Sequence, residues 1–437
     1  MGKLTQVAES MQKVLSDVAD KAGRETGFVK RESKLTGSLF SQTLVFGWLA
    51  NPEASLEQLT QTAAALGVEI SPQGLEQRFT KEAADCLKQV LEAAIKQAIA
   101  AEPVAIPILA RFTGVNIFDS SQVSLPSELK SIWNGNGGSG PDAALKFQVG
   151  MDLSTGELTG PLLQAGKASD KWLHKMVNLA ADSLRITDLG YFDLDEFANL
   201  ANKNVYWLSR IQPHTGMKDD AGKYWQVIDF LEHKQLNKIE MSILLGASHQ
   251  LPCRLFAVRV PPQVAETRRR RLRRDAKKRG YQAGQKALAM ADWTVFVTNA
   301  PAQLLSLDEA LIIARARWQI ELLFKLWKSH GQIDQSRSEK PWRILCEVYA
   351  KLIAMLIQHW VLIVSCWAYP NRSLFKAAQT VQKMALTFAS VFGSIKHICA
   401  VIATIQRCLA KGCRINKRKS KPNTYQLLLD LHNLNFS

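Results

Sequence analysis

The sequence predicts an α/β protein in which a strand-rich core lies between helical segments at both ends of the chain. Apolar residues recur at helical spacing in 1–105 and again in 336–437, whereas short β-rich segments begin at about residue 106. A chain of 437 residues is long enough for several domains with sizeable cores. The expected parts are a helical N-terminal domain (1–105), a core (106–211 plus 293–335), a β-rich insertion with a basic run (212–292) and a helical C-terminal domain (336–437).

The order of elements within the core predicts its topology. The expected strands span 115–123, 145–153, 158–166, 184–188, 205–211 and 293–301, with helices near 169–182 and 193–202. Three consecutive strands followed by helix, strand, helix and strand is the order of the RNase H-like fold in its retroviral integrase-type form. Helical bundles and Rossmann units do not begin with three meandering strands. We therefore expect an RNase H-like core that carries a β-strand insertion.

The chain is strongly basic and its cysteines are scattered. It holds 55 Lys and Arg against 39 Asp and Glu, a net charge of +16. This predicts a polyanionic partner, DNA or RNA rather than a membrane, with general basicity for solubility as the alternative.

The seven cysteines form no Cys-x-x-Cys pair, which argues against a zinc site or disulfide framework and fits a reducing cytoplasm. Gln358 and His359 interrupt the apolar run 352–369, so we expect a buried core helix there.

Residues 56–79 have the pattern of a helix-turn-helix. The first helix ends at Gly67, a suitable C-cap, and Ser71 with Pro72 supplies an N-cap and a first-turn proline for the second. The second helix can face a DNA major groove, although two helices joined by a glycine turn occur in many helical domains. The side chains that would read bases are Gln73, Gln77 and Arg78. Four cations upstream add capacity for phosphate contacts: Arg24, Lys30, Arg31 and Lys34.

The segment RWQIELLFKLWK (317–328) sets one carboxylate among three cations. On one helix, a narrow arc would hold Arg317, Glu321, Lys325 and Lys328. Beside this arc runs an apolar stripe that would face a core: Ile313, Ala316, Ile320, Leu323 and Trp327. An acid that holds a divalent ion, next to cations that hold phosphates, suits metal-dependent phosphoryl transfer. The alternative is a solvated helix face with i, i+4 ion pairs.

Two aspartates lie where the predicted sheet can bring them together with Glu321. We expect Asp119 at the end of the first strand and Asp188 at the end of the fourth. These strands are neighbours in an RNase H-like sheet. Three convergent carboxylates can hold two Mg²⁺ ions, for which Mn²⁺ can substitute, about 3.5–4 Å apart. Taken singly, an aspartate after a strand is more often a turn former or a helix cap.

Several motifs in their order along the chain resemble those of a known family. They are RWxIExxFKxxK (317–328), a strand followed by Asp-x-Gly-Tyr (188–191), YWLSR (206–210), the arginine-rich run (268–279) and WTVFVTN (293–299). Over most of its length the chain resembles the bacterial DDE transposases of insertion sequences, in the IS-four-type group named for a spaced Tyr-Arg-Glu-Lys signature. Each motif is moderately specific, whereas their ordered combination is highly specific.

The resemblance implies roles for individual residues. The metal-binding DDE triad becomes Asp119, Asp188 and Glu321. Arg317 and Lys328 supply the Arg and Lys of the signature, but Ala314 occupies its Tyr position, which removes one expected phosphate contact. Trp293 falls where related enzymes place an aromatic that receives a flipped base, with a core tryptophan as the alternative. The expected contacts to DNA phosphates are Arg317, Lys325, Lys328, Arg210, Arg268, Arg269, Arg270, Arg271, Arg273 and Arg274.

The implied activity is cut-and-paste transposition. The protein would bind the terminal inverted repeats of its element, nick the ends, form hairpins through the freed 3′-OH and join the ends to target DNA. The expected assembly is a homodimer on paired ends of double-stranded DNA, in the bacterial cytoplasm and associated with the nucleoid, without a membrane partner. Two alternatives stay open. One is a catalytically impaired or domesticated sequence-specific DNA-binding protein, which Ala314 favours; the other is an RNase H-like nuclease, against which the insertion argues.

Overall fold

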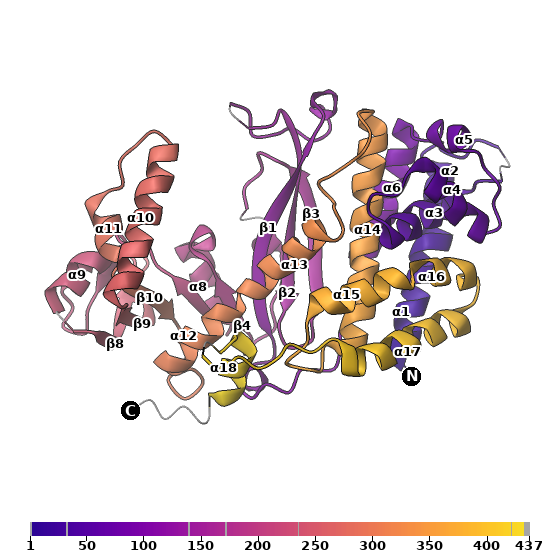
Figure 1. Ribbon diagram of the computed structural model, residues 1–437. Coiled ribbons are helices and arrows are strands. Elements are labelled where there is room, and N and C mark those ends of the chain that lie inside the picture. Colours follow the sequence, from indigo (N-terminus) through magenta and orange to yellow (C-terminus); the bar gives the residue numbers. More distant parts are fainter. Residues whose placement is uncertain are drawn as a thin grey trace. The chain divides into compact units, whose positions relative to one another are not determined.

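The computed structural model describes residues 2–31, 34–138, 140–170, 173–234, 236–420 and 422–431 (Figure 1). Within these residues the protein is a mixed α/β structure. Ten strands hydrogen-bond in the order β3-β2-β1-β4-β5-β10-β9-β8-β6-β7. The chain forms two compact units. Unit 1 comprises Met1–Ile106, Phe118–His174 and Trp318–Gln426, and unit 2 comprises Pro107–Ile117, Lys175–Arg317 and Leu427–Ser437.

Unit 1 is mainly helical. Its N-terminal helices are α1 (Gly2–Gln12), a π-helical stretch (Lys13–Val18), α2 (Ala19–Glu25), α3 (Gly37–Ala50), α4 (Leu56–Ala65), α5 (Pro72–Glu76) and α6 (Lys81–Ile95). Its C-terminal helices are α13 (Trp318–Ser329), α14 (Pro341–Cys366), α15 (Leu374–Lys383), α16 (Ala385–Val391) and α17 (Ile395–Gly412). Helix α18 (Thr424–Asp430) begins in unit 1 and continues into unit 2. Side-chain caps fix several starts: Thr36 accepts from the amide of Leu39 at α3, and Ser55 forms a capping box at α4. The helices predicted at both ends of the chain are confirmed.

Helix α14 forms the centre of unit 1. It runs for 26 residues and packs against α3 and α6 from one end of the chain and against α15 and α17 from the other. Among the residues described, it is the one helix long and apolar enough to cross a bilayer, yet 94% of its apolar window is buried inside the protein. The predicted core helix is confirmed. Because α14 needs apolar partners on every side, the structure joins the N- and C-terminal helices into one unit rather than two separate domains.

A buried histidine on α14 makes the stability of unit 1 depend on pH. The His359 ring donates through Nε2 to the carbonyl oxygen of Gly156 at 2.7 Å, and burial lowers its pKa from 6.5 to about 4. Because the folded pKa lies below the unfolded one, stability is complete above pH 6.5 and is lost as the pH falls toward 4. We expect a loss of about 3 kcal/mol across this window, measured by urea unfolding. His359→Gln should make the free energy of unfolding depend less on pH. An unchanged pH dependence would show that His359 is not its source.

The sheet strands of unit 1 support α13. Strand β1 (Val115–Leu125) lies next to β2 (Ala143–Asp152), which pairs antiparallel with β3 (Leu158–Ala165). Helix α13 packs on β2 through Phe147, whose ring centroid lies 5.6 Å from that of Phe324 and 5.9 Å from that of Trp327. This aromatic contact fixes which face of α13 is buried.

Unit 2 contains the parallel strands and the insertion. The first residues of β1 pair in parallel with β4 (Leu184–Thr187), β4 pairs in parallel with β5 (Tyr206–Arg210), and β5 pairs antiparallel with β10 (Trp293–Thr298). The predicted insertion supplies β6 (Gly216–Lys218), β7 (Tyr224–Gln226), β8 (Lys238–Leu245) and β9 (Leu251–Arg259). The helices of this unit are α8 (Leu194–Asn202), α9 (Val227–Lys234), α10 (Pro262–Lys278), α11 (Gln285–Met290) and α12 (Leu307–Ala316).

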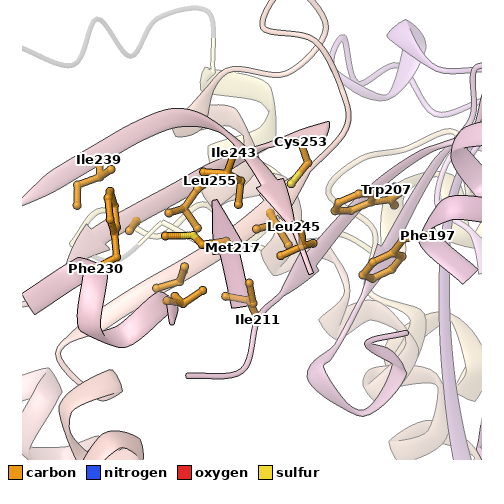
Figure 2. Packing of buried hydrophobic residues seen from close by; sticks show 14 of the residues in the cluster. Phe197, Trp207, Ile211, Met217, Phe230, Ile239, Ile243, Leu245, Cys253 and Leu255 are labelled. Atoms are coloured by element: carbon orange, nitrogen blue, oxygen red, sulfur yellow. The ribbon is translucent and has the colours of Figure 1, made fainter. Parts of the chain in front are cut away.

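The core of unit 2 joins α8 to the strands (Figure 2). Phe197 of α8 stacks on Trp207 of β5 with ring centroids 4.4 Å apart. Beneath this core, Arg185 of β4 is fully buried and pairs with Glu196 of α8 at 3.0 Å. Burial lowers the pKa of Arg185 to about 10, and the Glu196 carboxylate opposes that shift. The ion pair therefore fixes α8 against the strand that leads to Asp188.

The helix predicted near 169–182 forms only in part. The structure has α7 at Leu173–Met176, and residues 171 and 172 lie outside the described part of the chain. Asp182 adopts a left-handed φ of 61°. A right-handed helix cannot continue through that conformation, so the predicted helix was too long. The predicted strands of the core and the helix near 193–202 are confirmed.

Candidate active site

The strand register sets the positions of the two aspartates along their strands. In unit 2, Ile117 of β1 pairs with Ile186 of β4 in parallel register. Asp119 and Asp188 each follow these paired residues by two positions. Asp188 comes directly after β4, as predicted. Asp119 does not end its strand, because β1 continues to Leu125 beside β2; it lies instead just beyond the part of β1 that pairs with β4.

Asp119 is held by the residue that follows it. The backbone amide of Ser120 donates to Asp119 Oδ1 at 2.9 Å, and the Ser120 hydroxyl donates to Asp170 Oδ1 at 2.9 Å. Lys146 Nζ lies 3.0 Å from the same oxygen of Asp170. The sequence interpretation missed Ser120 and Asp170. Only the position of Ser120 directly after the aspartate could have indicated the first of them.

Asp188 lies near the arginine of the signature. It precedes a 3₁₀ turn (Leu189–Tyr191), and its Oδ2 atom is 3.8 Å from Nη2 of Arg317. Arg317 ends α12, and α13 begins at Trp318, so the single helix predicted across 317–328 is interrupted at its first residue. The amide of Arg317 bonds to Arg315 rather than to a carbonyl four residues back, although its backbone keeps right-handed angles. The arc therefore consists of Glu321 and the two lysines.

Helix α13 presents Glu321 on a firmly packed element. Ile320, Leu323 and Trp327 are buried, as the predicted stripe requires. Glu321 is half-buried and Lys325 is exposed. The Lys328 ammonium group donates to the backbone carbonyl of Gln122 in β1 at 3.0 Å, which ties α13 to the strand that carries Asp119. Ile313 and Ala316, the remaining stripe residues, are buried on α12.

The chemistry of the three carboxylates suits a hard divalent cation. Asp119 and Glu321 belong to unit 1 and Asp188 to unit 2. Within the described chain, no three or more His, Cys, Asp or Glu side chains are grouped so that they could hold a metal ion. The donor set consists of oxygen atoms alone, which Mg²⁺ and Mn²⁺ prefer over nitrogen and sulfur. The type of donor atom therefore suits the predicted metal, whereas the described structure does not group the three side chains around one.

The arginine-rich run forms α10, but its members have different environments. Arg268 donates to the carbonyl oxygen of Trp293 at 2.8 Å, and Arg269 pairs with Asp292 at 2.6 Å. These two side chains therefore brace β10, and their predicted contact with DNA stays a prediction. Four others are exposed and, among the described residues, form salt bridges with acids of the same helix: Arg270, Arg271, Arg273 and Arg274. Arg210 is exposed at the end of β5.

Two tryptophans of the predicted motifs differ in exposure. Trp293 is only 4% exposed and belongs to the core of unit 2, with the Arg259 guanidinium 4.9 Å from its ring centroid. A base cannot stack on a ring that is already covered, so this geometry favours the core alternative. Trp318, three residues before Glu321 on α13, is 55% exposed. Its place in the signature segment was visible in the sequence, but its exposure was not.

The helix-turn-helix pattern is present, although its second helix is short. Gly67 adopts a left-handed φ of 78° between α4 and α5. Helix α5 ends at Glu76, whose carboxylate pairs with Lys340 at 2.7 Å and with Arg343 at 2.8 Å. This contact docks one side of the motif on the start of α14. Of the predicted base-reading residues, Gln73 and Gln77 are exposed and Arg78 is half-buried.

Known proteins are similar to this chain in sequence over most of its length. The family model described as "Transposase DDE domain" matches residues 110–357. The transposase for insertion sequence element IS231F from Bacillus thuringiensis subsp. israelensis is 28% identical over 375 residues, covering 80% of this chain and 78% of that protein. The IS231D transposase from Bacillus thuringiensis subsp. finitimus is 26% identical, with 94% and 91% covered. The IS1151 transposase from Clostridium perfringens is 23% identical, with 79% and 78% covered.

The family model spans more than half of the chain and includes all three candidate carboxylates, both signature cations and the α10 run. The relatives extend the similarity into the helices on either side. The chain therefore belongs to the bacterial DDE transposases of the insertion-sequence group.

Proposed function

We propose that this transposase excises its element by a cut-and-paste route and that Asp119, Asp188 and Glu321 are its catalytic residues. The observation that carries the proposal is the parallel pairing of Ile117 with Ile186, because both aspartates follow it by two residues. Strand order β3-β2-β1-β4-β5, with β1, β4 and β5 parallel, supports an RNase H-like core. The packing of α13 on β2 and its tie to β1 support a role for Glu321.

The three carboxylates would hold two Mg²⁺ ions, which supply an activated water or 3′-OH nucleophile and stabilise the leaving oxygen. The chain's own residues orient the reaction. Ser120 holds one oxygen of Asp119. Arg317, next to Asp188, and the exposed Lys325 provide positive charge for the scissile phosphates, while Lys328 anchors α13 through Gln122. Each freed 3′-OH would attack the opposite strand to give a hairpin and later attack target DNA.

Two kinds of DNA contact are proposed outside this site: electrostatic contacts to the backbone and base-specific contacts to the inverted repeats. The exposed arginines of α10 would contact the duplex backbone, with an affinity that falls steeply with salt. Gln73 and Gln77 would read the terminal inverted repeats. Cutting both ends together requires a homodimer on paired ends, which would assemble on the bacterial nucleoid.

Incubation with a supercoiled donor tests the proposal directly. A plasmid carrying the element's inverted repeats should release the intervening segment in Mg²⁺, and a precleaved end should become joined to target DNA. Hydrolysis without any joined product would instead indicate an RNase H-like nuclease. The second candidate function, a catalytically impaired DNA-binding protein, is favoured by Ala314, because alanine cannot make the phosphate contact of the signature tyrosine. Specific binding without cleavage would select it.

Trp318 should contribute to DNA binding by stacking on a base. Such stacking is worth about 1–3 kcal/mol per base, so Trp318→Ala should weaken DNA-end binding by roughly 5- to 150-fold, whereas Trp318→Phe should retain most of it. Because the side chain is exposed, neither variant should shift the urea unfolding midpoint. Leu386→Ala, which shortens another exposed apolar side chain, is the matched control. If Trp318→Ala binds DNA ends as tightly as the parent does, Trp318 does not stack on a base.

A further inference from the structure

A basic pocket in unit 1 contains the four cations that precede the helix-turn-helix and that have no part in the proposed catalytic site. Its volume is about 870 Å³, and its walls come from α2, α3 and the loop between them. The charged residues that line it are Asp20, Arg24, Lys30, Arg31 and Lys34. Four cations therefore line a pocket whose wall includes a single carboxylate among the described residues.

Apolar anchors and one close helix contact give this pocket its shape. Phe28 and Leu35 of the loop are buried, and the Phe28 ring centroid lies 4.6 Å from that of Phe40 on α3. A Cβ atom on Gly37 would lie 2.1 Å from the backbone oxygen of Ala19, so only glycine permits α2 and α3 to approach this closely. The cations between Phe28 and Leu35 are consequently carried by a loop that is pinned near both ends.

Among the described residues, Asp20 lines the pocket and Glu82 of α6 interacts electrostatically with Lys30, so two carboxylates face the four cations. Asp20 accepts a hydrogen bond from the Ser38 amide at 2.7 Å, and its carboxylate is engaged at the positive end of α3. The side chains of Arg24, Lys30, Arg31 and Lys34 are exposed, and none forms a salt bridge with an acid in the described ranges. On α10, by contrast, Glu266 and Asp275 already engage the exposed arginines. The pocket therefore retains the greater capacity for an external anion.

We propose that the pocket binds successive phosphates of one DNA strand and that it anchors the duplex independently of the catalytic carboxylates. Lys30, Arg31 and Lys34 fall within five residues, which span at most roughly 17 Å. That span is several times the rise of about 3.4 Å per phosphate along the duplex axis, so the three cations can reach more than one phosphate of a strand. Mobile Lys and Arg side chains on an exposed loop suit a row of phosphates, whereas a single free phosphate is better held by a small cradle of backbone amides. The inference rests on the proposed action on DNA.

Two triple variants of the full-length protein, with the same loss of charge, test this proposal. Lys30→Gln, Arg31→Gln and Lys34→Gln together remove pocket cations. The control combines Lys13→Gln, Lys383→Gln and Lys396→Gln, which are exposed lysines elsewhere in unit 1. Duplex affinity is measured over a salt series. We expect the salt slope of the pocket variant to fall by about 0.9 for each phosphate that it no longer neutralises, with affinity on the order of 10–100-fold weaker at moderate salt, while the control stays parental.

Three results would overturn the proposal: parental binding by the pocket variant, equal losses in both variants, or thermal protection of the parent by inorganic phosphate together with unchanged duplex binding by the pocket variant. The last result would indicate a free-anion site. Urea midpoints matching the parent establish that both variants fold. Cleavage is measured separately. If the parent binds DNA through the pocket but never cuts it in Mg²⁺, the pocket proposal stands and the catalytic proposal fails.

Discussion

Glu321→Gln should abolish cleavage of a supercoiled donor in Mg²⁺ while leaving duplex binding unchanged. The amide keeps the size of the side chain but loses the negative charge that a divalent ion requires. Metal assistance is worth several kcal/mol in the transition state, so cleavage should fall on the order of 10³-fold or more. Glu321 is half-buried on a helix whose apolar face packs against β2, and the neutral side chain should not disturb that packing.

The matched control is Glu339→Gln, which removes an exposed carboxylate from the segment between α13 and α14. It should cut at the parental rate. Equal cleavage by Glu321→Gln and the parent would show that another residue supplies the third ligand. A parent that binds inverted repeats but cuts in neither Mg²⁺ nor Mn²⁺ would point to Ala314 and to a repurposed DNA-binding protein.

Lys351→Met should lower the free energy of unfolding of unit 1 by about 3–5 kcal/mol, the usual cost of breaking a buried ion pair. The Lys351 ammonium group is almost fully buried, lies 2.7 Å from Glu347 and donates to the carbonyls of Gln332 and Gln335 at 3.0 and 2.9 Å. Ser336 donates to the other oxygen of Glu347 at 2.7 Å. The pair therefore fastens the loop after α13 to α14. Removing the cation leaves a buried carboxylate and two carbonyls without their donor.

Urea unfolding, followed by circular dichroism, measures this loss as a lower midpoint. The double variant Lys351→Met with Glu347→Leu should recover part of the stability, because it removes the buried negative charge as well. Lys396→Met, which changes an exposed lysine, should keep the parental midpoint. If Lys351→Met unfolds at the parental urea concentration, the pair does not hold the loop.

Features that depend on residues nearby in the sequence were predicted well. Features that depend on which residues surround a side chain in the folded protein were not. The apolar stripe on α13, the Gly67 turn and the strand before Asp188 follow from periodicity and turn chemistry, and the structure has all three. Arg268 and Trp293 show the limit. In the sequence they are one cation in a run and one aromatic in a motif. The hydrogen bond between Arg268 and the Trp293 carbonyl depends on the pairing of β9 with β10 and on the position of α10, which the sequence does not give.

The assembly of unit 1 from both ends of the chain has a consequence for protein synthesis. Helices α3 and α6 leave the ribosome early, yet the apolar faces that they turn toward α14 stay uncovered until residue 366 has emerged. At 5–20 residues per second this interval is on the order of tens of seconds. A nascent or truncated transposase therefore cannot complete the unit that carries the basic pocket and the helix-turn-helix. If these elements bind DNA as proposed, that binding is delayed until most of the chain has been made.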